Sequence, residues 1–164
     1  MKKLLLIILL IVGCEEENSE VENFNGITEI DIEGNIISED SNDWCGEYIL
    51  YSTDCPTEIE IVESLGTPLI PAEYSLSPAY PNPFDSLATI YYGLPESPVV
   101  TFKVIDSAGN TIRNLGSAKQ EAGYYCISWD GRNDNGDIVE SDLYRVFIYA
   151  NHFSCSGDLQ FSPN

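Results

Sequence analysis

The chain has 164 residues, with 27 acidic and seven basic side chains, which gives a net charge of −20. A charge of this size and sign repels phosphate backbones and anionic lipid surfaces, and this excludes nucleic acid as a partner. The length suits one compact domain with additional segments.

Residues 1–13 have the composition of a signal for export. Lys2 and Lys3 precede an unbroken apolar run over residues 4–12, as in the n-region and h-region of a secretory signal. As a helix this run rises only about 14 Å, less than half of the ~30 Å hydrocarbon core of a bilayer. It is therefore too short to serve as a mature membrane anchor.

The run ends in Ile11-Val12-Gly13-Cys14, which resembles the lipobox of bacterial lipoproteins. The resemblance implies cleavage after residue 13, a diacylglyceryl group on the Cys14 thiol, and usually an acyl chain such as palmitate on the new amino terminus. Two or more chains hold a protein on a membrane, so the lipid is expected to be the membrane contact. The alternative is an ordinary signal peptide followed by a cysteine, but a small-residue cleavage site is missing nearby.

Residues 14–26 are predicted to form an acidic, disordered tether. Residues 15–73 hold 17 acids and no Lys or Arg, whereas residues 74–164 hold ten acids and five bases. A solvated spacer is one interpretation of this charge. The other interpretation is a signal for display on the outer cell surface. In some Bacteroidetes-like bacteria, acidic residues directly after the lipidated cysteine resemble such a signal. Together with the lipobox, either interpretation predicts a chain at the cell envelope, lipid-anchored in the outer membrane and facing the periplasm or the surface.

Residues 27–73 are predicted to form an acidic region of strands and loops, with a hairpin that turns at Gly34-Asn35. With the Cys14 thiol used for the lipid, four cysteines remain, and an even number favours two disulfides in an exported protein. We expect Cys45 to pair with the nearby Cys55, which closes a short loop, and Cys126 to pair with Cys155, which would hold the C-terminal tail over the sandwich. Two thiols without a nearby histidine make a poor zinc site.

Residues 74–164 are predicted to form an all-β, antiparallel sandwich. Apolar and polar side chains alternate in four short runs, which indicates strands with one buried face. The sets that contain Phe102, Trp129 and Tyr144 are expected to form the core. Asp106 and Gly109 predict a hairpin turn, helix content should be very low, and the residues after Asn151 are expected to be a tail.

A series of motifs in this part resembles the Ig-like domain of the flagellar hook-capping (FlgD-like) type. The motifs are Tyr80-Pro81-Asn82-Pro83-Phe84, residues 88–95, residues 102–106, Trp129-Asp130-Gly131 with residues 132–136, and residues 141–144. The resemblance implies a seven-stranded Ig-like sandwich without catalytic residues. The same module occurs in type IX secretion sorting domains, but those end in a basic tail, and this chain has no basic residue after Arg145.

Little in the sequence points to chemistry. His152 is the only histidine and has no recognisable partner motif, so a surface position is expected. Asp130, Asp134 and Asp137 are weak candidates for calcium, because their spacing does not match an EF-hand loop. We therefore expect no cofactor beyond the lipid on Cys14, with loose calcium binding as an alternative.

The sequence thus predicts a non-enzymatic, lipid-anchored envelope protein whose Ig-like module is structural or binds an unidentified protein partner. A calcium- or glycan-binding accessory lipoprotein and a type IX sorting module are the alternatives. Phe147 and Tyr149 on the outer face of their strand are expected to pack under another segment, or else to form a docking patch.

Overall fold

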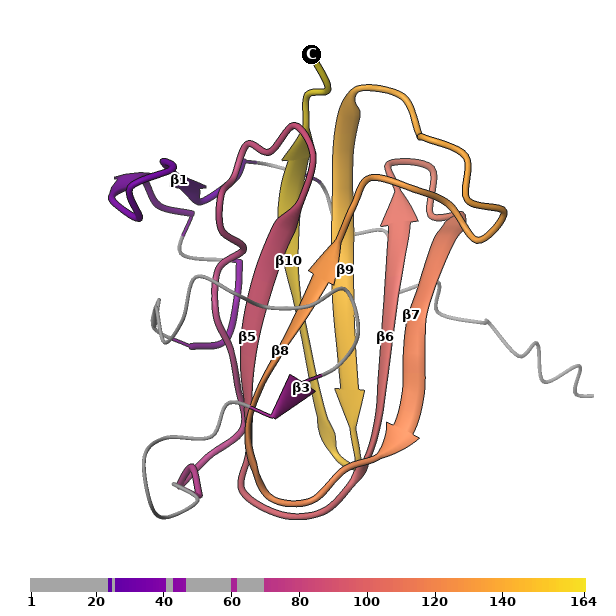
Figure 1. Ribbon diagram of the computed structural model, residues 1–164. Helices are drawn as coiled ribbons and strands as arrows, with labels where there is room; N and C mark the ends of the chain where they lie inside the picture. The colour runs from indigo at the N-terminus through magenta and orange to yellow at the C-terminus, as the bar shows by residue number, and fades with distance from the viewer. Residues whose placement is uncertain (1–23, 25, 41–42, 47–59, 62–69) are drawn as a thin grey trace, which may run out of the picture.

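The computed structural model describes residues 24, 26–40, 43–46, 60–61 and 70–164. The predicted signal peptide, Cys14 and Cys55 lie outside these residues. The described part of the chain consists of strands, turns and loops without a helix (Figure 1), and it contains no helix suited to crossing a bilayer.

Two four-stranded antiparallel sheets pack against each other (Figure 1), in the strand orders β10-β9-β6-β7 and β3-β8-β5-β4. The strands are β3 (Glu60–Ile61), β4 (Ser75–Leu76), β5 (Ala88–Leu94), β6 (Val99–Asp106), β7 (Thr111–Lys119), β8 (Gly123–Trp129), β9 (Asp142–Ala150) and β10 (Phe153–Phe161). The predicted all-β sandwich is therefore confirmed.

The core lies between the two sheets and contains the side chains that alternation had predicted. Phe102, Trp129 and Tyr144 are all buried there, and Tyr144 packs edge-on against Trp129. Tyr91 and Cys126 point to the opposite face of β5 and β8, yet they are buried too. The expectation of one wet face was wrong for these strands, because alternation alone does not show whether a further segment covers the outer face.

The predicted C-terminal tail is in fact a strand. β10 pairs with β9 along its whole length, from Phe153 opposite Ala150 to Phe161 opposite Asp142. From Cys155 onward every second residue of β10 is buried, but Gly157 is one of these inward residues, and Ser154 and Ser156 alternate with them on the other face. These small residues dilute the apolar pattern that identifies a strand.

Both predicted hairpins are confirmed. β6 and β7 join through Asp106, whose carboxylate accepts the Ala108 and Asn110 amides, and Gly109 has a φ of 84°. In the N-terminal region, β1 (Glu29–Ile30) pairs with β2 (Ile36–Ser38), and Gly34 in the turn has a φ of 88°. A positive φ is a conformation that glycine adopts without steric cost.

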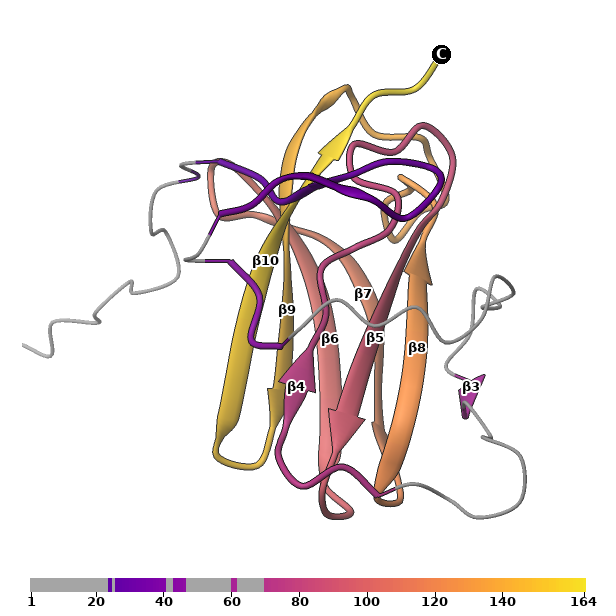
Figure 2. The same ribbon diagram turned by 90° about the vertical axis from the view of Figure 1, so that its left-hand side faces the viewer.

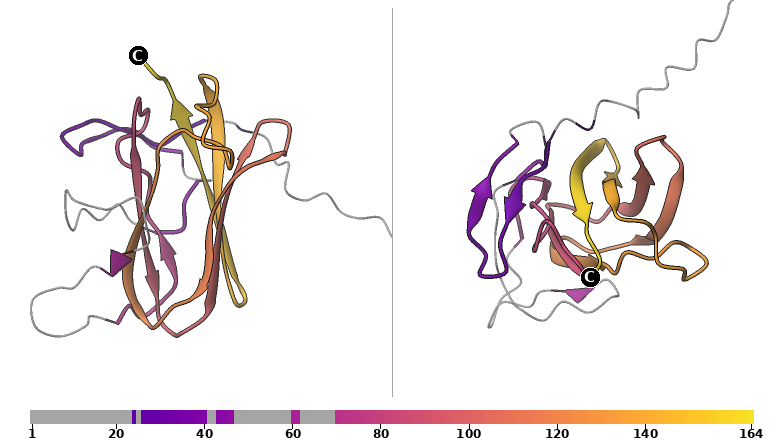
Figure 3. Two further views of the ribbon diagram at one scale, coloured as in Figure 1. Left: turned by 45° about the vertical axis from the view of Figure 1, so that its right-hand side comes forward. Right: turned by 90° about the horizontal axis from the view of Figure 1, so that it is seen from above.

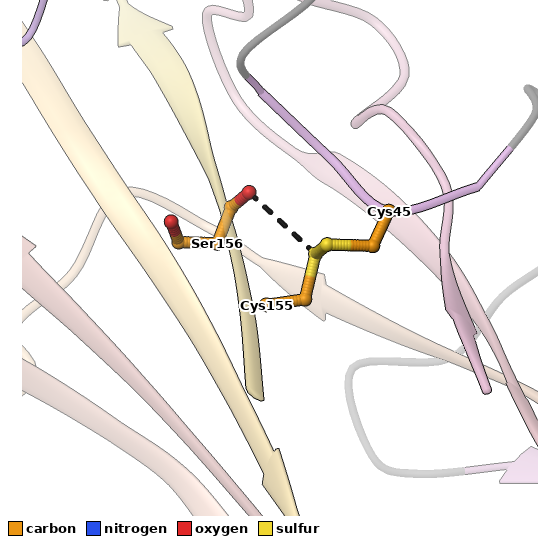
Figure 4. Close-up of a disulfide and its surroundings, with 3 residues drawn as sticks. All are labelled: Cys45, Cys155 and Ser156. Atoms are coloured by element: carbon orange, nitrogen blue, oxygen red, sulfur yellow. Dashed lines mark hydrogen bonds between the residues drawn. A yellow bond between two sulfur atoms is a disulfide. The ribbon is translucent and has the colours of Figure 1, made fainter. Parts of the chain in front are cut away.

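The segment of residues 43–46 joins the two sheets at one open edge. The Trp44 amide donates to the Ser156 carbonyl of β10, and the Cys45 amide donates to the Leu76 carbonyl of β4. A disulfide between Cys45 and Cys155 strengthens this connection (Figure 4), with 6.0 Å between the two Cα atoms. One short segment therefore holds together the edge strands of opposite sheets.

This disulfide contradicts both predicted pairs. Cys45 does not pair with Cys55, and Cys155 does not pair with Cys126, although Cys126 is also disulfide-bonded. The prediction favoured a short loop, whereas the fold places Cys45 beside β10, where it meets Cys155, 110 residues further along the chain. Proximity in the folded state, and not loop length, decides which thiols meet.

Trp44 covers Gly157 in the middle of β10. A Cβ atom at residue 157 would overlap the Trp44 indole ring. The ring is buried, although Trp44 has a φ of 60°, a left-handed conformation that costs a bulky residue about 1 kcal/mol. Because Gly157 has no side chain, the Trp44 ring can lie directly on the backbone of β10, and this contact allows the 43–46 segment to approach β10 closely.

We predict that Gly157→Ala destabilises the protein by about 2 kcal/mol, because the added methyl group overpacks the contact with Trp44. Urea unfolding of the full chain measures this change. Gly123→Ala is the matched control, since a Cβ there would lie 3.5 Å from the nearest atom of Tyr125, an ordinary contact. Equal losses in the two variants would contradict the role of Trp44.

Candidate functional site

The hairpin β1–β2 lies across the end of the sandwich that also carries the C-terminus (Figure 2), and the view from above shows it beside the main strands (Figure 3). Between the hairpin and the sandwich is a groove of about 410 Å³. Its lining consists of residues 29–32 and Ile37 from the hairpin, residues 81–85 before β5, and Ser162 and Asn164 after β10. We call this the end groove, and it is the candidate site.

Asn82 joins the three segments that build the end groove. Its side-chain amide donates to the carbonyls of Thr28 and Asp158, both at 2.9 Å, and its side-chain oxygen accepts the Gln160 amide at 2.9 Å. Its backbone exchanges two hydrogen bonds with Ile30. The amide nitrogen of this fully buried side chain therefore bonds to both the hairpin region and β10, and its oxygen bonds to β10.

A buried ion pair lies beside Asn82 on the outer face of β9 and β10. Arg145 and Asp158 are opposite each other in the register, and the guanidinium donates to the carboxylate at 2.6 and 2.8 Å. The Phe24 ring covers Arg145, with 4.5 Å between the guanidinium carbon and the ring centroid. Burial raises the pKa of Asp158, and the hydrogen bonds from Arg145 offset part of that rise.

Asp43 brings a second carboxylate to this ion pair. Its Oδ2 accepts the backbone amide of Asp158 at 3.4 Å. Burial, reinforced by the negative charge of Asp158, raises the pKa of Asp43 to about 7. The start of the 43–46 segment is therefore held by a group that titrates near neutral pH.

The walls of the end groove combine apolar and acidic side chains. Ile32 and Ile37 remain 75% and 63% exposed, whereas Ile30 on the floor is buried. The carboxylates of Glu29, Asp31 and Asp85 line the same groove, and no Lys or Arg does. Hydrogen bonds from Asn35 hold the pKa of Asp31 below its usual value, so this carboxylate is ionised at neutral pH.

The structure gives two of the predicted calcium candidates other partners. Asp130 lies 3.5 Å from the Arg132 guanidinium, and Asp134 accepts two hydrogen bonds from Asn114 on the edge of β7. Asp137 is exposed. Among the residues that the structure describes, no group of three or more His, Cys, Asp or Glu side chains is arranged to hold a metal ion.

The remaining sequence candidates lie apart from the end groove. His152 is exposed and contacts Tyr74 edge-on, with 5.6 Å between the ring centroids. Phe147 and Tyr149 stack on the outer face of β9, and the Lys103 ammonium lies 5.2 and 5.4 Å from their centroids. Both rings are half-buried.

Sequence reasoning missed Asn82, Arg145, Asp158 and Asp43 as members of one cluster. Asn82 was noted only as part of a motif, although an amide between two prolines is an unusual signal. Asp158 in a supposed tail looked like one of many surface acids. Alternation along β10 could have placed it on the outer face with Arg145, but the register that sets the two residues opposite each other is not a local signal.

We predict that Asn82→Ala destabilises the full chain by about 3 kcal/mol, because three buried backbone groups lose their partner. Hydrogen exchange at the Ile30 amide should also become faster, since this amide bonds to the Asn82 carbonyl. Asn135→Ala, at an exposed position, should change neither measurement. Unchanged exchange at Ile30 in the Asn82 variant would contradict the linking role.

A second prediction concerns pH. Because the pKa of Asp43 is about 7 in the folded chain and near 4 when unfolded, the folded state binds more protons between these values. Asp43 therefore lowers stability as the pH rises from about 4 to about 7. Asp43→Asn keeps an acceptor oxygen. After allowance for solvent screening, its free energy of unfolding should exceed that of the wild type by about 1 kcal/mol at pH 8 and by nearly nothing at pH 4. Asp137→Asn controls for net charge, and an equal gain at both pH values would refute the assignment.

Comparisons with known proteins agree with the strands of the sandwich. Residues 85–152 match the family model of the FlgD Ig-like domain. This range covers β5 to β9 and excludes Asn82, β10 and the N-terminal region. No curated protein matches the chain significantly.

One similar solved structure is dimeric latent PorU from Porphyromonas gingivalis. The TM-score is 0.42 at 17% sequence identity, and the match covers 52% of this chain and 9% of that one. The chain thus spans less than a tenth of that protein. The predicted resemblance is confirmed for residues 85–152, which match the FlgD Ig-like domain within an all-β sandwich.

Proposed function

We propose that the protein is an exported, lipid-anchored envelope lipoprotein whose Ig-like sandwich is a non-catalytic, protein-binding module. The observation that carries this proposal is the order of segments at the start of the chain. Lys2 and Lys3, the apolar run over residues 4–12 and Cys14 together resemble a lipoprotein signal.

The disulfides support export. Cys45 pairs with Cys155, and Cys126 is bonded as well. Structural disulfides form and persist in oxidising compartments such as the periplasm and the cell surface, and they are rare in a reducing cytosol. A thiol at Cys14 that carries lipid would take no part in them.

A binding role fits the end groove better than catalysis does. Its polar side chains are three carboxylates, the amides of Asn82 and Asn164 and the hydroxyl of Ser162, and the Asn82 amide is committed to structural hydrogen bonds. His152, the only histidine in the sequence, lies against Tyr74 and does not line the groove. Exposed isoleucines beside fixed backbone instead suit contact with another protein.

The lipid anchor is tested by labelling cells with palmitate. Wild-type chain should incorporate the label and fractionate with membranes, whereas Cys14→Ser should lose both properties. Cys45→Ser removes a different thiol and should keep the label, because acylation depends on the start of the chain. Equal incorporation into wild type and Cys14→Ser, or none into wild type, would refute the proposal.

A further inference from the structure

We propose that the end groove binds a segment of a partner protein in which basic residues alternate with aliphatic ones. This inference rests on the proposed function, since it specifies the chemistry of the partner at the same site. Three properties of the groove lead to it: exposed aliphatic walls, carboxylates that form no ion pair with a described residue, and a fixed floor.

The exposed aliphatic side chains of the groove favour a partner with apolar side chains. Six large hydrophobic side chains are markedly exposed among the described residues, and three of them belong to this one hairpin: Ile32, Ile36 and Ile37. Ile32 and Ile37 both line the groove, together with Pro81 and Pro83. Covering these side chains would remove apolar surface from water, which favours association.

The carboxylates of the groove favour a partner that also carries positive charge. Glu29, Asp31 and Asp85 line the groove, and no ion pair involves any of them in the described part of the chain. The net charge of −20 adds a long-range field that attracts cations to the surface. Complementary charge at such a rim raises the association rate and selects against acidic partners.

The floor of the groove is already in place before binding. Asn82 is fixed by hydrogen bonds to two segments, residues 28–30 and residues 158–160, and Ile30 is bonded through both its amide and its carbonyl. Phe84 is likewise held between Gln160 and Ser162 of the C-terminal segment. A preformed surface loses little conformational entropy when a partner docks.

A second copy of this chain is a poor occupant. It would bring the same net negative charge to an acidic groove. Of its cationic side chains, Arg113, Arg132 and Arg145 already face Asp134, Asp130 and Asp158 respectively. The partner is therefore expected to be a different, basic protein segment.

The test measures binding of a fluorescein-labelled peptide of alternating lysine and valine to the full-length chain in nonionic detergent, by fluorescence anisotropy. Glu29→Gln/Asp85→Asn should weaken binding about tenfold, and Ile32→Ser/Ile37→Ser should weaken it about fivefold. Asp137→Asn/Glu140→Gln removes the same charge from the exposed loop before β9 and should change affinity less than about twofold. Thermal unfolding midpoints establish that each variant is folded.

Several outcomes would overturn the inference: no binding to the wild type, equal losses in the groove and loop variants, or equal binding of a lysine–glycine peptide. Equal losses would mean general attraction to an acidic surface. Sedimentation showing a dimer that Ile32→Ser/Ile37→Ser disrupts would instead assign the groove to a second copy. None of these results bears on palmitate labelling, so the failure of the groove and the failure of the lipid anchor are distinguishable.

Discussion

The sandwich depends on how its two sheets are held at the edge where β4 and β10 lie. Consecutive amides of Trp44 and Cys45 bond to opposite sheets, the disulfide to Cys155 makes this connection covalent, and the indole ring packs on Gly157. An open sandwich edge leaves unpaired backbone groups that invite association with other chains. Here a segment from the N-terminal region occupies that edge.

This closure determines what the rest of the N-terminal region does. Residues 43–46 are held against β10, the hairpin β1–β2 lies across the end of the sandwich (Figure 2), and Phe24 packs on Arg145 of β9. At that end of the sandwich, Asn82 forms a hydrogen bond to Thr28, just before the hairpin, and the end groove lies between the hairpin and the sandwich. The region that matches the FlgD Ig-like domain thus supplies most of the core, while the groove is built mainly by segments outside it.

The sequence allowed the strands β5, β6, β8 and β9 to be predicted, because strict alternation and turn residues are local signals. The site could not be predicted in the same way. Asn82 acts through contacts with residues 28 and 158–160, which no local pattern connects. The disulfide was mispredicted because a nearby thiol looked favourable, and β10 was missed because Gly157, needed under Trp44, weakened its apolar pattern.

The central claim is that the 43–46 segment closes the sandwich edge through Cys45 and Cys155. Proteolysis of the unreduced full chain, followed by mass spectrometry of linked peptides, tests it most directly. The account predicts a peptide containing Cys45 joined to one containing Cys155, released by reduction. A peptide pair that joins Cys45 to Cys55, or Cys155 to Cys126, would contradict it.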